Sequence, residues 1–470
     1  MDEIFTGWLL DLYADGKDVT LWLLDDNSQR RNLTHTFSAT FYAAGPSAQL
    51  RNLWRWLFGQ GISVRLARIE RKDVFQGMVT VLAVEVIHAS QLDALFRQVV
   101  ELFPDLTYYD ADVSLSLRYA SAFGVFPLAR CRVVASVNRI QTITPLDSPW
   151  DLDPEPSPLR SLSLEPDRDP AHSRPKHIVV SYEKVRYVLP LEPMRAFLIS
   201  LRSTLERYDP DLLLTSWGDT WLLPYLLKLS KEYNLPLPLN RAETQDVIEH
   251  DARTYFSYGQ IVYKGSQVQL RGRLHLDRRN AMMWSDYGLE GVLEMARVTA
   301  LPIQDAAHLS PGTGISSMQF ITALRQGILI PWHKHQAEQP KTALDLIHSD
   351  MGGLVYQPTI GLHKDVSGID FVSMYPGIMV RFNISPEVPR SKDGELTPAS
   401  GQPGIVPQTL APLLEKRIAF KTALANLHPK TAGAKSTRLG PPRRNGCWSP
   451  ASATWDTKTP ASDVSRRMKL

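Results

Sequence analysis

A stretch rich in proline and aspartate divides this chain of 470 residues near its first third. Between residues 145 and 158 it holds five prolines and three aspartates and shows no apolar periodicity, which is typical of a boundary between folded units. Domains contain roughly 150 residues, so a chain of this length predicts about three of them. We therefore expect an N-terminal domain over residues 1–145 and a linker over 146–158.

The composition is that of a globular protein, with 43% hydrophobic and 21% charged residues. Cys131 and Cys447 are its two cysteines, which excludes a disulfide framework and a zinc cluster built on cysteines. The N-terminus lacks the basic segment of a secretory signal, and the longest apolar runs are too short to cross a bilayer. We expect a cytoplasmic protein with no membrane partner.

The excess of positive charge is confined to the last forty residues. The formal net charge is +3 and the pI is near 8.7, which suggests a nucleic-acid partner. Residues 431–470, however, carry eight basic and two acidic side chains, so the other 430 residues carry a net charge of −3. A basic tail is often a nucleic-acid-binding arm, but a solvated and disordered end is the commoner case.

Apolar patterns predict strands and helices on both sides of the linker. Before it they predict strands at 8–13, 19–24 and 78–87 and helices at 48–59 and 90–103, the second capped by Ser90. After it they predict strands at 162–164, 177–181 and 212–215, short strands between 255 and 276, and helices at 193–207, 287–298 and 316–329. Beyond residue 350 they predict strands at 354–357 and 368–372, a helix beginning near Tyr375, and a basic amphipathic helix over 409–427.

The segment from Gly368 to Met379, GIDFVSMYPGIM, is the most informative about chemistry. It places one carboxylate, Asp370, at the end of an expected strand, followed by a turn and by a helix that starts at Pro376. A strand holds such an acid rigidly for Mg²⁺, while free amides in the turn can bind phosphate oxygens. Considered alone, an aspartate at a strand end is nevertheless more often structural than catalytic.

The whole segment closely resembles motif A of the family B DNA polymerases, Asp-x-x-Ser-Leu-Tyr-Pro-Ser-Ile, with Met and Gly at the fifth and eighth positions. The resemblance implies that Asp370 ligates two catalytic Mg²⁺ ions and that the backbone carbonyl of Phe371 contributes to one of them. It also implies that amides around Ser373 and Met374 hold the incoming deoxynucleoside triphosphate. Tyr375 would pack under its sugar and exclude a 2′-hydroxyl.

Further matches extend the resemblance over roughly residues 105–430. They comprise Tyr109 to Val113 with Phe126 to Leu128, Asn383 with Pro386, Gly404 to Leu410, and Leu414 to Arg417. Gly352 and Gly353 resemble the family's glycine segment, which contacts the template strand of a DNA primer-template. Arg417 and Lys421 could contact phosphates, although charged helix faces are usually just solvated.

The family usually carries an RNase H-like 3′–5′ exonuclease with four carboxylates around two metals, and its motifs are degenerate here. The first, Asp-x-Glu, corresponds to Glu165-Pro166-Asp167, in which the two acids are transposed. The second has Leu222 where the family has Asp, and the third either offers Gly291 in place of its acid or is deleted. We expect an exonuclease-like fold without activity over residues 159–335. The alternative is that another acid, such as Asp219, rescues metal binding.

No Asp-x-Asp pair, the family's second set of metal-binding carboxylates, follows Asp370 in this sequence. Codons permitted for residues 444–464, read in a frame shifted by two bases, admit the string KWLLVTCFGYLGYKNARFGR, which resembles the family's fingers motif. We therefore expect residues 336–430 to form a partial palm with the start of a fingers helix, and residues 431–470 to be a disordered, frameshifted tail. A selected basic arm is the competing interpretation.

Together these patterns predict a multidomain α/β and α+β protein, with an N-terminal α+β domain, an RNase H-like exonuclease-type domain and the start of a polymerase palm. The family adds deoxynucleotides to a primer 3′-hydroxyl on a DNA template with two Mg²⁺ ions. We expect this chain alone to be inactive and to hold Mg²⁺ weakly or not at all. The alternative is a non-catalytic DNA-binding subunit of a split polymerase, completed by a separate C-terminal chain; a nuclease is less favoured. A DNA partner would place the protein at the nucleoid.

Overall fold

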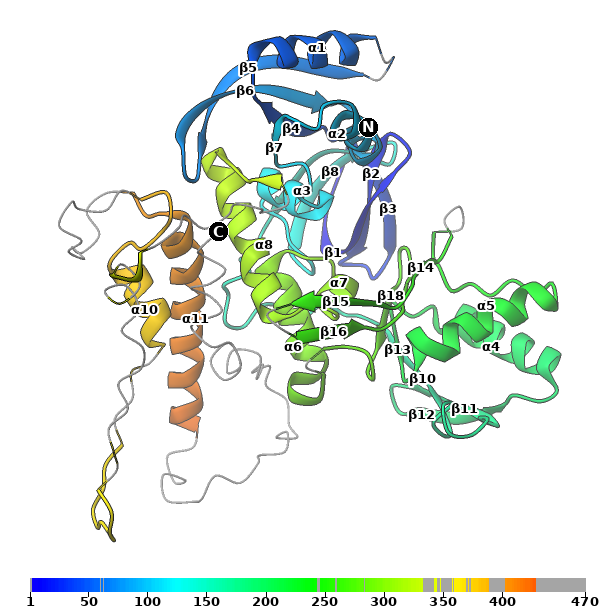
Figure 1. Cartoon of the computed structure of the whole chain (residues 1–470). Helices are drawn as coiled ribbons and strands as arrows, with labels where there is room; N and C mark the ends of the chain where they lie inside the picture. Colours follow the sequence, from blue (N-terminus) through cyan, green and yellow to red (C-terminus); the bar gives the residue numbers. More distant parts are fainter. Residues whose placement is uncertain are drawn as a thin grey trace.

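The computed structural model describes residues 2–332, apart from 60, 62, 243–245, 258–259 and 283, together with 342–344, 347, 357, 359–368, 371, 373–388 and 402–427. Figure 1 shows three larger β-sheets and, beside them, a group of helices that includes α8 (Pro311–Gln326), α10 (Met374–Arg381) and α11 (Ile405–Leu427). The strands predicted at 354–357 and 368–372 fall largely outside the described residues, and the tail at 431–470 falls entirely outside them.

Five strands close a barrel at the N-terminus in the order β1-β2-β3-β9-β8. They are β1 (Glu3–Asp15), β2 (Asp18–Asp25), β3 (Arg30–His35), β8 (Arg130–Ser136) and β9 (Arg139–Pro145). Apolar side chains such as Leu21, Leu23 and Val133 fill its interior, because alternate residues of each strand point inward. The strands predicted at 8–13 and 19–24 are confirmed.

A second N-terminal sheet has the order β19-β5-β6-β4-β7 and is covered on one face by two helices. The elements are β4 (Ala39–Ala44), β5 (Val64–Asp73), β6 (Gly77–Val86), β7 (Thr107–Tyr109), β19 (Ile328–Leu329), α1 (Ser47–Phe58) and α2 (Leu92–Leu102). The prediction that Ser90 caps the second helix is wrong. Ser90 lies in the short 3₁₀-helix η1 (Ala89–Gln91), where its hydroxyl donates to the carbonyl of Gly16, and Gln91 precedes α2.

Strand β19 joins this sheet from a distant part of the sequence. Ile328 and Leu329 pair in parallel with the end of β5, at Lys72 and Asp73. The helix predicted over 316–329 is therefore too long at its C-terminal end and too short at its N-terminal end. Helix α8 ends at Gln326, because Gly327 adopts the left-handed region at φ 66° and turns the chain into β19.

The third sheet is mixed and has the order β12-β11-β10-β13-β18. Its strands are β10 (Ser161–Pro166), β11 (His177–Tyr182), β12 (Val185–Pro190), β13 (Leu212–Thr215) and β18 (Leu274–Asp277). Strand β11 is antiparallel to β10 and β12, whereas β13 and β18 run parallel to β10. Helices α4 (Met194–Tyr208) and α5 (Leu223–Glu232) contribute to its apolar core. The carboxyl ends of three parallel strands thus meet at one edge.

Smaller elements complete this region. Strands β14 (Ile248–His250) and β17 (Gln267–Gln269) pair with each other, as do β15 (Arg253–Ser257) and β16 (Gln260–Lys264). Helix α3 (Leu115–Phe123), from the N-terminal region, packs against α8, and α6 (Trp284–Thr299) and α7 (Ile303–Ala306) precede α8 along the chain. Within α6, Gly288 has non-helical backbone angles, so the helix is kinked where the sequence predicts a helix starting at residue 287.

Candidate functional site

The segment that resembles motif A becomes a helix start in the structure. Asp370 lies outside the described residues, and the first fully described part is Ser373 followed by α10. Ser373 has a left-handed backbone at φ 52°, and its carbonyl accepts the hydrogen bond from Gly377 N at 2.8 Å. Its hydroxyl is buried and has no hydrogen-bond partner within the described residues. A helix N-terminus without acidic residues favours an anion, since its first amides are free and the helix dipole is positive there.

Large apolar side chains around this helix start are exposed. Phe371 is 73% exposed, Tyr375 53% and Met374 39%. Core packing does not account for such side chains when they gather in one place, and they often mark a binding surface. The roles predicted for Phe371, Ser373, Met374 and Tyr375 remain predictions, but three of the four present apolar surface at the N-terminus of α10.

The residues after α10 cap the next long helix, α11. Asn383 Oδ1 accepts from Gly404 N at 2.8 Å, and Glu387 Oε1 accepts from Ile405 N at 2.5 Å. The hydroxyl of Ser385 donates to the other oxygen of Glu387 at 2.7 Å and accepts from Val406 N at 3.2 Å. Three amides at the start of α11 are therefore satisfied by side chains that lie about twenty residues earlier in the sequence. This cap fixes α11 relative to the helix that begins in motif A.

Two of the predicted DNA-binding residues, Gly352 and Gly353, lie outside the described residues. Arg417 of α11 is only 6% exposed, and burial lowers its pKa. Lys421 on the same helix is exposed. In this conformation, therefore, Lys421 rather than Arg417 presents its side chain to solvent, where a phosphate could reach it.

Next to Arg417, Lys416 ties α11 to the rest of the chain. Its ammonium donates to the carbonyl of Pro149 at 2.8 Å and pairs with Glu294 of α6 at 2.5 Å, with a side chain that is 3% exposed. Burial lowers the pKa of Lys416, while the charge of Glu294 opposes that shift. The segment predicted as a linker is thus fastened to α11.

Glu165, from the first of the predicted exonuclease motifs, lies at the carboxyl edge of the mixed sheet. Glu165, near the end of β10, accepts a hydrogen bond from the hydroxyl of Ser163 at 3.1 Å and forms an ion pair with Arg278, which directly follows β18. The next arginine, Arg279, lies over the ring of Trp217 at 4.8 Å from its centroid. Trp217 precedes the π-helix that ends at Leu222 and has a left-handed backbone at φ 56°. Two consecutive arginines therefore contact Glu165 and Trp217.

The other acid of the first motif, Asp167, is engaged elsewhere. Its carboxylate accepts from Lys176 N at 2.9 Å and from the guanidinium of Arg168 at 2.8 Å. Slight burial would raise its pKa, but these hydrogen bonds and that from His177 N lower it to about 2. Asp167 is therefore ionised at neutral pH, and its hydrogen bonds stabilise the connection between β10 and β11.

The remaining motif positions offer no ligand atoms. Leu222 is fully buried in the core between α4 and α5, at the end of the π-helix η2 (Gly218–Leu222), and Gly291 lies buried in α6 without a side chain. Within the described part of the chain, no group of three or more His, Cys, Asp or Glu side chains could hold a metal ion. The residues present at this edge do not fit a two-metal exonuclease centre.

Sequence reasoning missed the role of Asp219, which is buried behind this edge. Its two oxygens accept from Val268 N at 2.9 Å and Asn280 Nδ2 at 2.7 Å, and His275 and His308 approach them within 3.5 and 3.6 Å. Burial raises the pKa of Asp219, and the neighbouring His308 and Asn280 oppose the shift. Because protein donors already occupy both oxygens, the geometry argues against rescue of metal binding by Asp219.

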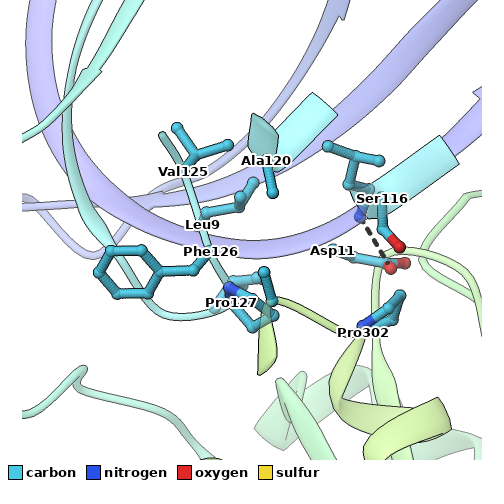
Figure 2. Close-up of a pocket in the computed structure, with 11 residues that line it drawn as sticks. Leu9, Asp11, Ser116, Ala120, Val125, Phe126, Pro127 and Pro302 are labelled. Carbon is cyan, nitrogen blue, oxygen red and sulfur yellow. Dashed lines mark hydrogen bonds between the residues drawn. The ribbon is translucent and has the colours of Figure 1, made fainter. Parts of the chain in front are cut away.

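A small cavity of about 30 Å³ lies where β1 and α3 of the N-terminal region meet the residues between α6 and α7. Figure 2 shows its lining, which is apolar apart from Ser116 and Asp11. The Asp11 carboxylate accepts from Leu12 N at 2.9 Å and from Gly272 N at 3.0 Å, and burial raises its pKa. The cavity is far smaller than the pockets that hold ligands of nucleotide size.

Comparisons with known proteins find similarity to DNA polymerases. No protein-family model matches the chain. A DNA polymerase of Archaeoglobus fulgidus is 23% identical over 92% of this chain and 62% of its own length. DNA polymerase 1 of Pyrococcus abyssi is 23% identical over 50% of this chain and 37% of its own length. The solved family B DNA polymerase of Pyrobaculum calidifontis matches the structure with a TM-score of 0.62 and 20% identity, over 91% of this chain and 65% of that chain.

The chain is similar in sequence to archaeal DNA polymerases, and its fold resembles that of a family B DNA polymerase. It spans less than two thirds of the length of the Archaeoglobus polymerase and of the Pyrobaculum structure. The predicted resemblance to the family B DNA polymerases is confirmed, and so is a mixed α/β architecture like theirs. Within the described residues, no helix combines the length and apolarity needed to span a membrane.

Proposed function

We propose that this chain supplies the N-terminal, exonuclease-like and first palm portions of a DNA polymerase of family B. The intact enzyme would add deoxynucleotides to a primer 3′-hydroxyl on a DNA template, with two Mg²⁺ ions. The observation that carries the proposal is the start of α10, where the motif A segment joins a free helix N-terminus to the exposed ring of Tyr375. Relatedness to DNA polymerases over most of the chain supports it.

Each proposed role follows from the chemistry of its residue. Asp370 and the carbonyl of Phe371 would hold Mg²⁺, which neutralises the charge that develops on the phosphates. The amides at Ser373 and Met374 would bind phosphate oxygens at the positive end of α10. Tyr375 would offer its exposed ring to the sugar of the nucleotide.

We further propose that the 470-residue chain extends no primer by itself. Phosphoryl transfer between two metal ions needs carboxylates on both sides of the metals, and the sequence offers no Asp-x-Asp pair after Asp370. Binding of primer-template DNA would remain, through Lys421 and the exposed N-terminus of α10. In the split-polymerase alternative, the partner would be a separate chain that carries carboxylates of this kind.

The test is to measure binding and primer extension separately. Fluorescence anisotropy with a labelled primer-template should show binding that weakens as salt rises. Extension of that primer with Mg²⁺ and deoxynucleotides should be absent for the chain alone. Tyr375→Ala should weaken stabilisation of the complex by the complementary deoxynucleotide, whereas Ile347→Ala, outside α10, should not. Absence of salt-dependent DNA binding would refute the proposal, and primer extension by the chain alone would refute the claim of inactivity.

We also propose that the mixed sheet belongs to an exonuclease-like domain without nuclease activity. Its three antiparallel strands followed by two parallel ones support an RNase H-like arrangement, and the ion pair of Glu165 with Arg278 supports the lack of activity, because it engages an acid of the predicted first motif. Labelled single-stranded DNA should therefore stay intact with Mn²⁺ or Mg²⁺. Degradation that survives further purification and disappears in Glu165→Gln would refute this.

A further inference from the structure

A cluster of four arginines and two aspartates lies at the opposite edge of the mixed sheet from Glu165, where the sheet meets the barrel. We call it the arginine cluster, and its members are Arg30, Arg160, Arg241, Arg273, Asp209 and Asp211. Arg30 begins strand β3 of the barrel, whereas the others flank the starts of β10, β13 and β18 or lie in the loop that holds Arg241. The cluster thus connects the barrel to the mixed sheet.

Asp211 is fully buried at the centre of the cluster. The guanidinium of Arg30 donates two hydrogen bonds to its carboxylate, of 2.8 and 2.6 Å, and the backbone N–H of Arg160 donates a third at 2.9 Å. A nitrogen of Arg241 lies 3.1 Å from the first of its two oxygens. Burial alone would raise the pKa of Asp211, but these donors lower it overall, so it is ionised. Its capacity to accept hydrogen bonds is used up.

Asp209 is the second acid, and arginines contact both of its oxygens. Arg241 and Arg273 donate to one oxygen at 2.8 and 3.1 Å, and Arg160 donates to the other at 2.8 Å. Its pKa is likewise lowered, against burial, by these arginines. The carboxylates of Asp209 and Asp211 are the ones that the structure pairs with the four guanidiniums within the described residues.

Among the residues that the structure describes, the cluster therefore carries two positive charges in excess of its paired carboxylates. Backbone carbonyls, such as those of Pro210 and Leu239 around Arg273, offset part of this excess. Burial lowers the pKa of Arg273 to about 10, and the nearby charge of Arg241 adds to the effect. A buried excess of like charge is costly, and an anion reduces that cost.

Arg160 is the member through which an anion can enter. Its side chain is 32% exposed, whereas those of Arg30, Arg241 and Arg273 are 11% exposed or less. Its Nε is buried and has no hydrogen-bond partner within the described residues, although Asp211 lies 3.9 Å away. A guanidinium offers a planar set of donors that matches the oxygens of a phosphate group.

We propose that the arginine cluster binds one phosphate-type oxyanion at Arg160. The anion completes the charge balance of the cluster and strengthens the contact between the barrel and the mixed sheet. It can be a free phosphate or a phosphodiester group of a bound nucleic acid, since both present the same oxygens. The site lies at the opposite edge of the sheet from the degenerate exonuclease motifs and does not depend on the polymerase proposal.

The experiment is thermal unfolding of the full chain in potassium phosphate and in potassium chloride at equal ionic strength. The midpoint should rise with phosphate and saturate, because a ligand that binds only the folded state stabilises it. Arg160→Gln should raise the half-saturating phosphate concentration at least tenfold. The matched control is Arg202→Gln, at an exposed arginine of α4 that pairs with Glu206 outside the cluster, and it should respond like the wild type.

Equilibrium dialysis with labelled phosphate provides a second readout that does not require any variant to fold. We expect one phosphate per chain, and displacement by a short single-stranded oligonucleotide would identify a phosphodiester as the occupant. Retention of phosphate in its presence would identify free phosphate. The proposal is overturned if phosphate gives no saturable shift beyond that of chloride, or if Arg160→Gln and Arg202→Gln respond alike.

Discussion

Replacing Asp110 with asparagine should stabilise the folded chain at pH 7 and flatten its pH dependence between pH 4 and 7. The Asp110 carboxyl is 4% exposed and accepts from Ile330 N at 2.7 Å, while its own backbone N–H donates to the Ile330 carbonyl at 2.8 Å. Burial raises its pKa to about 6, although the hydrogen bond from Ile330 and the charge of Arg118 oppose the shift. The ionised form of Asp110 therefore destabilises the folded chain relative to the protonated form.

The size of that cost follows from the shift in pKa. The ordinary value for an aspartate is 3.8, so the shift is about two pH units, and each unit corresponds to ~1.4 kcal/mol. The free energy of unfolding should therefore be about 3 kcal/mol lower above pH 6 than below pH 3.8 on account of this group. The direction of the effect follows from the pKa of Asp110, which is higher in the folded than in the unfolded chain. Folding therefore favours the protonated carboxyl, and this contribution to stability is lost as the pH rises through the folded pKa.

Asparagine keeps an oxygen that can accept from Ile330 N but carries no charge. Urea unfolding followed by tryptophan fluorescence, at pH values from 4 to 8 and constant ionic strength, measures the effect. Asp105→Asn, at an exposed position just before β7, is the control and should follow the wild type. If Asp110→Asn unfolds at lower urea than the wild type at pH 7, attraction to Arg118 outweighs the cost of burial and the reasoning is wrong.

Three other substitutions test the contacts around the site. Glu387→Ala should cost about 1–2 kcal/mol by uncapping α11, visible as faster hydrogen exchange at its first amides; unchanged exchange would contradict the cap. Lys416→Met should cost about 3 kcal/mol by leaving Glu294 unpaired and should speed proteolysis within residues 146–158; an unaltered digestion pattern would show that the contact does not fasten this segment. Arg278→Ala should cost at most about 1 kcal/mol, since this ion pair is partly exposed. Mn²⁺ should not raise the midpoint of that variant, and a rise would mean that Glu165 can bind a metal.

Local patterns predicted those elements whose signal lies within a few residues. Alternating apolar residues predict β1, β2 and β6, and the run at 409–427 predicts most of α11. The prediction failed at Ser90 and at residues 328–329, where distant partners decide the outcome. Ser90 donates to Gly16, and Ile328 pairs with Lys72, so neither contact leaves a local signal.

In the candidate sites, too, the sequence predicts features made by neighbouring residues and misses contacts between distant ones. The motif A segment is readable because its residues are contiguous, and the helix start at Met374 lies two residues before the one predicted at Pro376. The cap of α11 by Asn383 and Glu387 spans some twenty residues, and the Glu165–Arg278 pair spans 113, so spacing alone cannot reveal them. Such contacts depend on strand order, which the sequence pattern does not determine.

The return of β19 to the N-terminal sheet also sets an order of events on the ribosome. The edge of β5 at Lys72 and Asp73 emerges more than 250 residues before the strand that covers it. At synthesis rates of about 5–20 residues per second, this edge stays open for roughly 10–50 seconds. An open strand edge is a template for pairing with other chains. Nascent chains stalled before residue 328 should therefore be the species most prone to associate with one another through the β5 edge.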